Sequence, residues 1–163
     1  MTRKKVILGA FVLAVVGLAL ALVLIGGAGG KFSCGWLGAR VGVLWTVVAT
    51  EGGTAACIIA VLVAPLMGSV ILLPLLGIML NGTSSVLYGT VPELTSTDRA
   101  ERAFALFYTG TIGAGAIAPV LYGILGDKLG IDQATLATAI TALGVLPLTF
   151  ALAPRLMPDE QRS

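Results

Sequence analysis

The sequence has no histidine, and only 11 % of its 163 residues are charged, against about 25 % in an ordinary soluble domain. Without histidine, the chain lacks the commonest general base and the commonest metal ligand of proteins. Ten basic and eight acidic residues leave a net charge of +2, too small to hold a nucleic acid by its phosphates. So few charged side chains cannot cover a surface that faces water. We therefore expect no soluble domain, no enzyme, no nucleic-acid partner, no cofactor and no metal site.

Hydrophobic residues make up 57 % of the sequence, and the mean hydropathy is +1.02. About 20 apolar residues in a helix cross a hydrocarbon core of about 30 Å. Pro65 and Gly68 divide one long apolar run, in which Glu51 is the only charge, into two segments. Because backbone within lipid must satisfy its own hydrogen bonds, these segments favour helices. The sequence predicts one all-α domain over residues 1–163, a polytopic membrane helix bundle with five transmembrane helices at residues 6–27, 41–63, 70–90, 103–125 and 133–153.

The basic residues predict the orientation, because lysine and arginine collect on the cytoplasmic side of a membrane. Six of them lie on the side of the first loop, the third loop and the C-terminus, against four on the other side. We expect a multi-pass protein of the cell membrane with a cytoplasmic C-terminus, although the cluster at residues 3–5 argues for a cytoplasmic N-terminus. Cys34 and Cys57 lie in separate apolar surroundings and are expected to be free thiols.

Two octapeptides share one pattern of glycines and a basic residue. Residues 35–42 read GWLGARVG and residues 123–130 read GILGDKLG. Three predicted spans separate the copies, so they face opposite sides of the membrane, as in the inverted repeats of many secondary transporters. Chance recurrence among 22 glycines is the alternative. We interpret the pair as a partial inverted three-span repeat whose first unit lacks its leading span, with the loop-motif positions Gly35, Arg40, Gly42, Gly123, Asp127, Lys128 and Gly130.

These motifs resemble those of the major facilitator superfamily. Residues 35–42 are similar to the Gly-x-x-x-Asp-Arg-x-Gly loop of its second half, with Ala39 in place of the acid, and residues 123–130 keep the acid and the basic residue. An acid-and-arginine loop and a glycine and proline spacing are similar as well, at Pro92, Glu93, Arg99, Arg102, Gly115, Pro119 and Gly123. The resemblance implies the eighth to twelfth spans of such a transporter, truncated at its N-terminus, with the octapeptides as gating loops, and it extends to members of the efflux type.

The resemblance also implies a function. We expect transport of a small molecule by alternating access, as proton-coupled export, by a chain that is an incomplete half and has an N-terminal transporter half as its partner. The competing hypothesis is a non-transporting membrane subunit that packs against another complex, which would need the glycine surfaces but not Glu51. Glycines and alanines at residues 110–116 form such a small-residue surface, and close packing is its simplest use.

Glu51 is the only ionisable residue well inside a predicted span. A charged carboxylate near the middle of a bilayer costs at least about 2.5–3.5 kcal/mol, so it needs a partner or a cavity. Its role is either coupling or substrate contact, or a structural hydrogen bond. Polar residues of the third predicted span fall at i, i+3, i+4 and i+7, on one helix face that lines a path or bonds a neighbouring helix: Asn81, Ser84, Ser85 and Tyr88. We select Glu51, Asn81, Ser85 and Tyr88 as candidates for the substrate path or for coupling.

Overall fold

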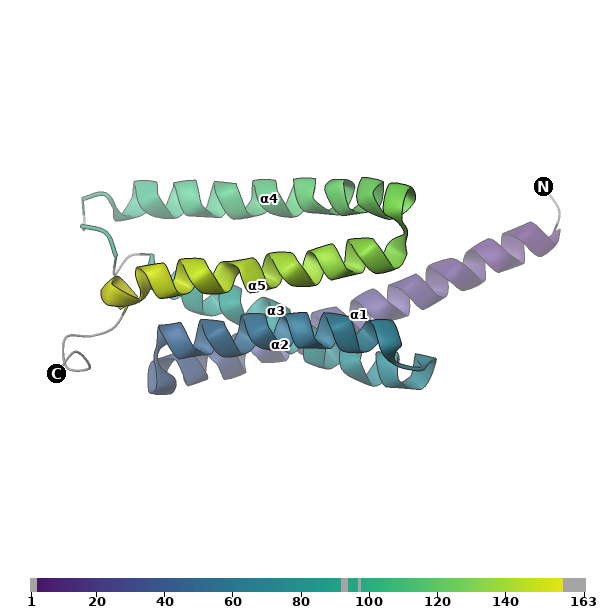
Figure 1. Ribbon diagram of the computed structural model, residues 1–163, viewed down its shortest axis with the longest axis horizontal. Helices are drawn as coiled ribbons and strands as arrows, with labels where there is room; N and C mark the ends of the chain where they lie inside the picture. Colours follow the sequence, from purple (N-terminus) through teal and green to yellow (C-terminus); the bar gives the residue numbers. More distant parts are fainter. Residues whose placement is uncertain (1–2, 92–93, 97, 157–163) are drawn as a thin grey trace.

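The computed structural model describes residues 3–91, 94–96 and 98–156, and it is all-helical over these residues. Five helices run in alternating directions, each joined to the next at one end of the bundle (Figure 1). Each is long and apolar enough to span a membrane, which confirms the predicted fold class. Pro92 and Glu93 of the expected acid-and-arginine loop lie outside the described residues. The helices are α1 (Arg3–Val41), α2 (Val43–Val63), α3 (Leu66–Thr90), α4 (Ala100–Leu129) and α5 (Ile131–Leu156).

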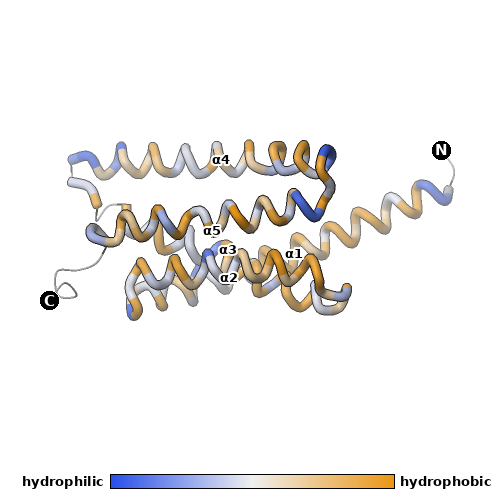
Figure 2. The backbone as a smooth tube through the Cα atoms, in the orientation of Figure 1, coloured by the Kyte–Doolittle hydropathy of each residue, from blue (hydrophilic) through white to orange (hydrophobic). Residues whose placement is uncertain are grey.

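The outer surface of the bundle is apolar. Hydrophobic residues extend along all five helices, and hydrophilic residues gather near the helix ends (Figure 2). Leu13, Val63 and Leu106 are 73 %, 83 % and 75 % exposed, although each is a large aliphatic side chain. Such a surface would associate in water and is stable in contact with lipid.

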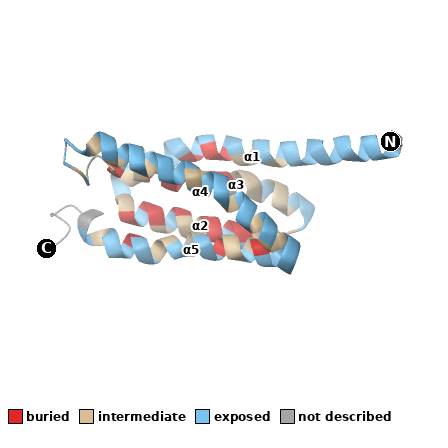
Figure 3. Cartoon of the chain, turned by 90° about the horizontal axis from the view of Figure 1, so that it is seen from above, coloured by how far each residue is buried: buried red, intermediate tan, exposed pale blue. Residues whose placement is uncertain are grey.

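The helices differ in how much they bury. α1 packs along α3, α3 along α2, α2 along α5, and α5 along α4. The apolar core lies between α2 and α5 around Ala55, Ile58 and Ala139. α2 has more buried residues than any other described helix, whereas α4 has none among its described residues and lies at the outside of the bundle (Figure 3).

Glycines bring α1 and α3 into backbone contact. Gly26 and Gly30 are buried against Pro74 and Ile78, and a Cβ on Gly30 would lie only 2.8 Å from the Ile78 Cα. From the opposite side, a Cβ on Gly77 would lie 2.9 Å from the backbone nitrogen of Gly27, so neither helix has room for a side chain here. Cys34 and Cys57 are free and buried, as predicted.

The structure differs from the sequence expectation in the first connection. Residues 28–40, expected to join two spans, are helical, and α1 continues to Val41. Glycine is a weak helix former, but contact with α3 compensates for its low propensity. α1 is thus 39 residues long, about 58 Å at a rise of about 1.5 Å per residue. Its N-terminal half projects beyond the bundle with its apolar side chains exposed (Figure 1).

Candidate functional site

The two octapeptides form the same structure. Each ends a helix at a glycine with positive φ: Gly42 has φ 92° and ψ 155°, and Gly130 has φ 100° and ψ 157°. Only glycine adopts this backbone region without strain. The Gly42 N–H donates to the Gly38 carbonyl at 3.1 Å, and the Gly130 N–H donates to the Gly126 carbonyl at 2.9 Å. In both cases one residue joins two antiparallel helices.

The two turns lie at opposite ends of the bundle. The α1–α2 turn is at one end, and the α4–α5 turn is at the other (Figure 1). The middle glycine of each octapeptide lies close to the helix that follows: a Cβ on Gly38 would lie 3.8 Å from the Thr46 hydroxyl, and one on Gly126 would lie 3.6 Å from the Ala134 Cβ. Gly38 also packs on α3, where its Cβ would lie 3.3 Å from a methyl group of Val86. The repeated sequence is therefore a repeated helix–turn–helix contact in inverted orientation.

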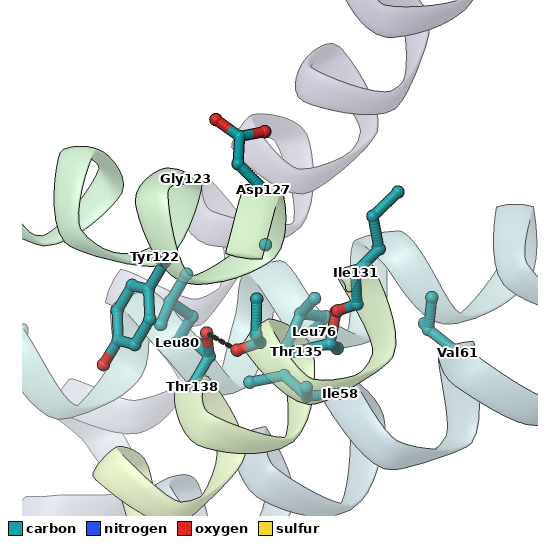
Figure 4. Close-up of a pocket in the computed structure, with 12 residues that line it drawn as sticks. Ile58, Val61, Leu76, Leu80, Tyr122, Gly123, Asp127, Ile131, Thr135 and Thr138 are labelled. Atoms are coloured by element: carbon teal, nitrogen blue, oxygen red, sulfur yellow. Dashed lines mark hydrogen bonds between the residues drawn. The ribbon is translucent and has the colours of Figure 1, made fainter. Parts of the chain in front are cut away.

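The charged residues of the octapeptides make no ion pair with each other. Arg40 lies over the Trp36 ring, 4.4 Å from its centroid. Asp127 and Lys128 are exposed, and the carboxylate of Asp127 points away from the neighbouring side chains (Figure 4). Within the part of the chain that the structure describes, the one salt bridge joins Asp98 and Arg99 at 3.8 Å. Any charge latch at these loops requires residues from outside the described bundle.

Glu51 lines a cavity of about 190 Å³ between three helices. It lies in the ninth position of α2 and is half-buried. Among the described residues, no lysine or arginine lines the cavity, so this wall carries one acidic group and no basic group. The other lining residues come from α3 and α4 and are aliphatic, hydroxyl-bearing or aromatic: Leu80, Thr83, Ser84, Leu87, Tyr88, Phe107 and Thr111.

The predicted polar face of α3 divides between two neighbours. Tyr88 lines the Glu51 cavity, as does Ser84. Asn81 instead lies against α1, because a Cβ on Gly27 would be 2.5 Å from its side-chain nitrogen. The same nitrogen donates to the Gly77 carbonyl of its own helix at 3.2 Å. Ser85 is half-buried and does not line the cavity. Residues at i, i+3, i+4 and i+7 span a face broad enough to meet two helices, so Asn81 and Ser85 are not cavity residues.

Threonine and aromatic residues that the sequence analysis did not select complete the site. The hydroxyls of Thr50 and Thr83 lie 2.6 Å apart and join α2 to α3 beside Glu51. Thr83 lies five positions before Tyr88. It therefore falls outside a set of residues chosen by i+3 and i+4 spacing. The threonines of α2 recur at every fourth position, which is the sequence signal for this polar seam: Thr46, Thr50 and Thr54.

Tyr88 holds α4 against α3. Its ring centroid lies 5.3 Å from that of Phe107 in an edge-to-face arrangement, and 5.9 Å and 6.0 Å from those of Phe104 and Tyr108. Its hydroxyl lies 3.0 Å from the Thr111 hydroxyl. These contacts place an aromatic wall on the side of the cavity formed by α4.

A second cavity of about 580 Å³ lies between α2, α3, α4 and α5, near the α4–α5 turn (Figure 4). Most of its wall is aliphatic, with Ile58 and Leu76 on one side and Tyr122 and Thr138 on the other. Leu80 lines both cavities, so the two adjoin along the inner side of α4. Asp127 also lines the larger cavity, so each of the two adjoining cavities has one carboxylate among its lining residues.

The chain matches no protein-family model, no curated protein and no solved structure. The candidate site is therefore defined by its own geometry. A carboxylate without a basic partner among the described residues lies in a small cavity inside a membrane bundle, between a packed group of helices and a helical hairpin. Such a group can exchange a proton or pair with a cation that enters the cavity.

Proposed function

We propose that this chain is part of a membrane carrier of the major facilitator type, which moves a small molecule across the cell membrane by alternating access. Transport is coupled to protons and runs in the export direction, and the C-terminus is cytoplasmic. The observation that carries the proposal is Glu51: an acidic group at a cavity wall inside a bundle, where no basic side chain of the described residues lines that cavity.

The arrangement of the helices supports a rocking motion. α4 and α5 form a hairpin that turns at Gly130, and α1 and α2 form one that turns at Gly42 at the opposite end. α4 has no buried residue among those described, and cavities separate it from α2 and α3, so moving it breaks few packed contacts. In the proposed cycle, α4 swings away from α2 and α3 about its turn at Gly130 while α5 stays packed on α2, and the Glu51 cavity opens to one side of the membrane at a time.

A second helical unit completes the carrier in this proposal. Gly110 and Gly113 lie one turn apart on one face of α4, and an added Cβ on either would meet no atom of the described chain within 4 Å, so this face can accept another helix closely. An N-terminal half would cover α4 from that side, and the Glu51 cavity would lie behind α4 within the present half. The lipid bilayer covers the remaining apolar surface.

One feature favours the alternative, a non-transporting subunit of a membrane assembly. The N-terminal half of α1 projects from the bundle, with Leu8 and Leu13 exposed by 63 % and 73 %. An apolar helix of this kind can associate with the spans of another protein. Such a subunit would use α1 and α4 as contact surfaces and would not depend on Glu51.

The Glu51→Gln variant separates the two functions. Everted membrane vesicles containing the chain and its native partners are energised, and a pH-sensitive dye reports proton movement while a panel of small molecules is added. For a carrier, an exported compound collapses part of the proton gradient in the wild type. Glu51→Gln should reduce this response by at least about tenfold, because a neutral amide can neither carry the proton nor pair with a charge.

Glu101→Gln is the matched control. Glu101 is an exposed acid in the first turn of α4 and does not line the Glu51 cavity. It should leave the flux unchanged, and both variants should reach the membrane in equal amounts. Equal flux in the wild type and Glu51→Gln, or no flux with any compound while the chain still co-purifies with a membrane complex, would support the assembly subunit instead.

A further inference from the structure

In the part of the chain that the structure describes, the carboxylate of Glu51 has no basic side chain beside it in the wall of its cavity. Glu51 is the only charged residue between Val41 and Pro92, so α2 and α3 supply no basic side chain. From α4, the residues at the cavity are Phe107 and Thr111, neither of them charged. An ionised carboxylate inside a membrane bundle usually pairs with a counter-charge or faces water, and the hydrogen bond that Thr83 offers Glu51 brings no charge. The occupant of the cavity is the remaining source of that counter-charge.

The hydroxyl groups around Glu51 are already paired. Thr83 bonds Thr50, Ser84 bonds the Asn81 carbonyl at 2.9 Å, and Tyr88 bonds Thr111. A hard metal ion such as Ca²⁺ takes about six to eight oxygen ligands. The described residues contain no group of three histidine, cysteine or acidic side chains that could hold a metal. Glu51 is the one anionic ligand that the described lining residues supply, so the cavity suits a cation that needs few directed ligands.

Aromatic and aliphatic groups form the rest of the wall. Tyr88 and Phe107 both line the cavity, and their ring centroids are 5.3 Å apart. Aromatic faces attract ammonium groups, and most strongly where water is excluded. Leu80 and Leu87 supply alkyl contacts. A volume of about 190 Å³ is smaller than the roughly 300–1,000 Å³ of drug-sized pockets, so the cavity suits a small headgroup.

Building on the proposed transport function, we propose that the substrate of this carrier is a small organic cation with an alkylated ammonium group. The ammonium group pairs with the Glu51 carboxylate and lies against Tyr88 and Phe107, while its alkyl groups contact Leu80 and Leu87. Because one carboxylate receives either the proton or the ammonium group, the two compete for Glu51, and their exchange couples export of the cation to entry of a proton.

Choline and its uncharged carbon analogue, 3,3-dimethylbutan-1-ol, test the charge requirement directly. The full chain, purified together with its native membrane partners, is placed in lipid nanodiscs, and binding is measured by equilibrium dialysis. We expect choline to bind and the alcohol to bind at least about tenfold more weakly, because the two differ mainly in charge. Raising the proton concentration should weaken choline binding and leave alcohol binding unchanged.

Variants assign the binding to the cavity. Glu51→Gln should weaken choline binding at least about tenfold, and Phe107→Leu about threefold to thirtyfold. Glu101→Gln and Phe32→Leu are the matched controls, because Glu101 lies at the start of α4 and Phe32 is 84 % exposed on α1. Both controls should bind choline as the wild type does. If Glu51→Gln does not assemble, Phe107→Leu and the comparison with the alcohol still decide the test.

Equal binding of choline and the alcohol would overturn the proposal, and so would choline binding that Glu51→Gln and Phe107→Leu leave unchanged. Proton-coupled flux of a neutral or anionic compound, without choline binding, would overturn the cation assignment and leave the proposed transport function standing. Glu51-dependent choline binding in a protein that moves no protons would support the cation site and count against transport. Failure of the inference is thus distinguishable from failure of the function.

Discussion

Two glycine-rich helices of this protein use their small residues differently. In α1, Gly26 and Gly30 are buried against the backbone of α3. In α4, Gly110, Gly113 and Gly115 have nothing within 4 Å in the described chain that a side chain would meet. The two stretches look alike in the sequence, and only one of them is a packing surface within this bundle.

The difference lies in the facing helix. α3 presents Gly77 and Gly82 to α1, so both helices are narrow where they meet. α4 meets its neighbours through large side chains, with Tyr88 of α3 on Phe107 and its own Tyr122 hydroxyl 2.7 Å from that of Thr141 on α5. Large side chains hold α4 at a distance and leave cavities behind it. A glycine thus permits close approach, and a second small residue is needed to use it.

The largest expected effect on stability comes from replacing one glycine of α1 and one glycine of α4 with leucine. Gly30→Leu places a side chain where the backbone of Ile78 lies, and it should lower the free energy of unfolding by about 3 kcal/mol or more. Gly113→Leu enters open space in α4 and should leave the free energy of unfolding unchanged or raise it by up to about 1 kcal/mol. Titration of the chain in mixed micelles with a denaturing detergent, followed by circular dichroism, measures both values.

The same pair of variants also tests for a partner on α4. In native membranes, Gly113→Leu should release the chain from its complex although it leaves the isolated chain stable. If Gly113→Leu destabilised the isolated chain as much as Gly30→Leu, α4 would be packed and the contrast between the two helices would be wrong.

A smaller effect is expected at the two turn glycines. Gly42→Ala and Gly130→Ala force alanine into a backbone region that suits only glycine, and each should cost about 1–3 kcal/mol of unfolding free energy. Gly35→Ala and Gly123→Ala, in the same octapeptides, occupy helical positions with open space and should stabilise by up to about 1 kcal/mol. The cost should be the same at both turns, because it is set by local backbone conformation. A cost at one turn alone would mean that the repeat is not structural.

Charge spacing and proline positions were enough to predict the five helices. The apolar segments between charges are long, and Pro65 separates α2 from α3. The octapeptide pattern indicated an inverted repeat. The structure adds that the last glycine of each copy ends a helix with positive φ, although Gly42 was expected inside the span 41–63. The helical course of residues 28–40 was not predictable from local sequence. It depends on α3, whose glycines lie about fifty residues further along the chain.

The site was predictable in part. Glu51 is conspicuous as the only acid in a long apolar run, and Tyr88 shares its cavity. Asn81 and Ser85 share a helix face with Tyr88 by spacing. That face of α3 meets both α1 and the cavity, and neither Asn81 nor Ser85 lines the cavity. Phe107 was missed because its role depends on where α4 lies relative to α3, and helix periodicity carries no information about that placement.

The smallest effects are expected from removing one of two hydroxyl pairs. One pair lies between the packed helices α2 and α3, and the other joins α3 to the exposed helix α4. Thr83→Val removes the buried bond to Thr50, and Tyr88→Phe removes the exposed bond to Thr111. In each case the remaining hydroxyl keeps a bond to a backbone carbonyl of its own helix, so neither variant leaves a polar group unpaired. Thr83→Val should cost about 0.6 kcal/mol, the usual value for such bonds within a membrane protein, and Tyr88→Phe should cost less. Double-mutant cycles with Thr50→Val and Thr111→Val measure each coupling energy. A larger coupling for Tyr88 and Thr111 would mean that α4 is held more firmly than its exposure indicates, and the proposed movement of α4 would lose its physical basis.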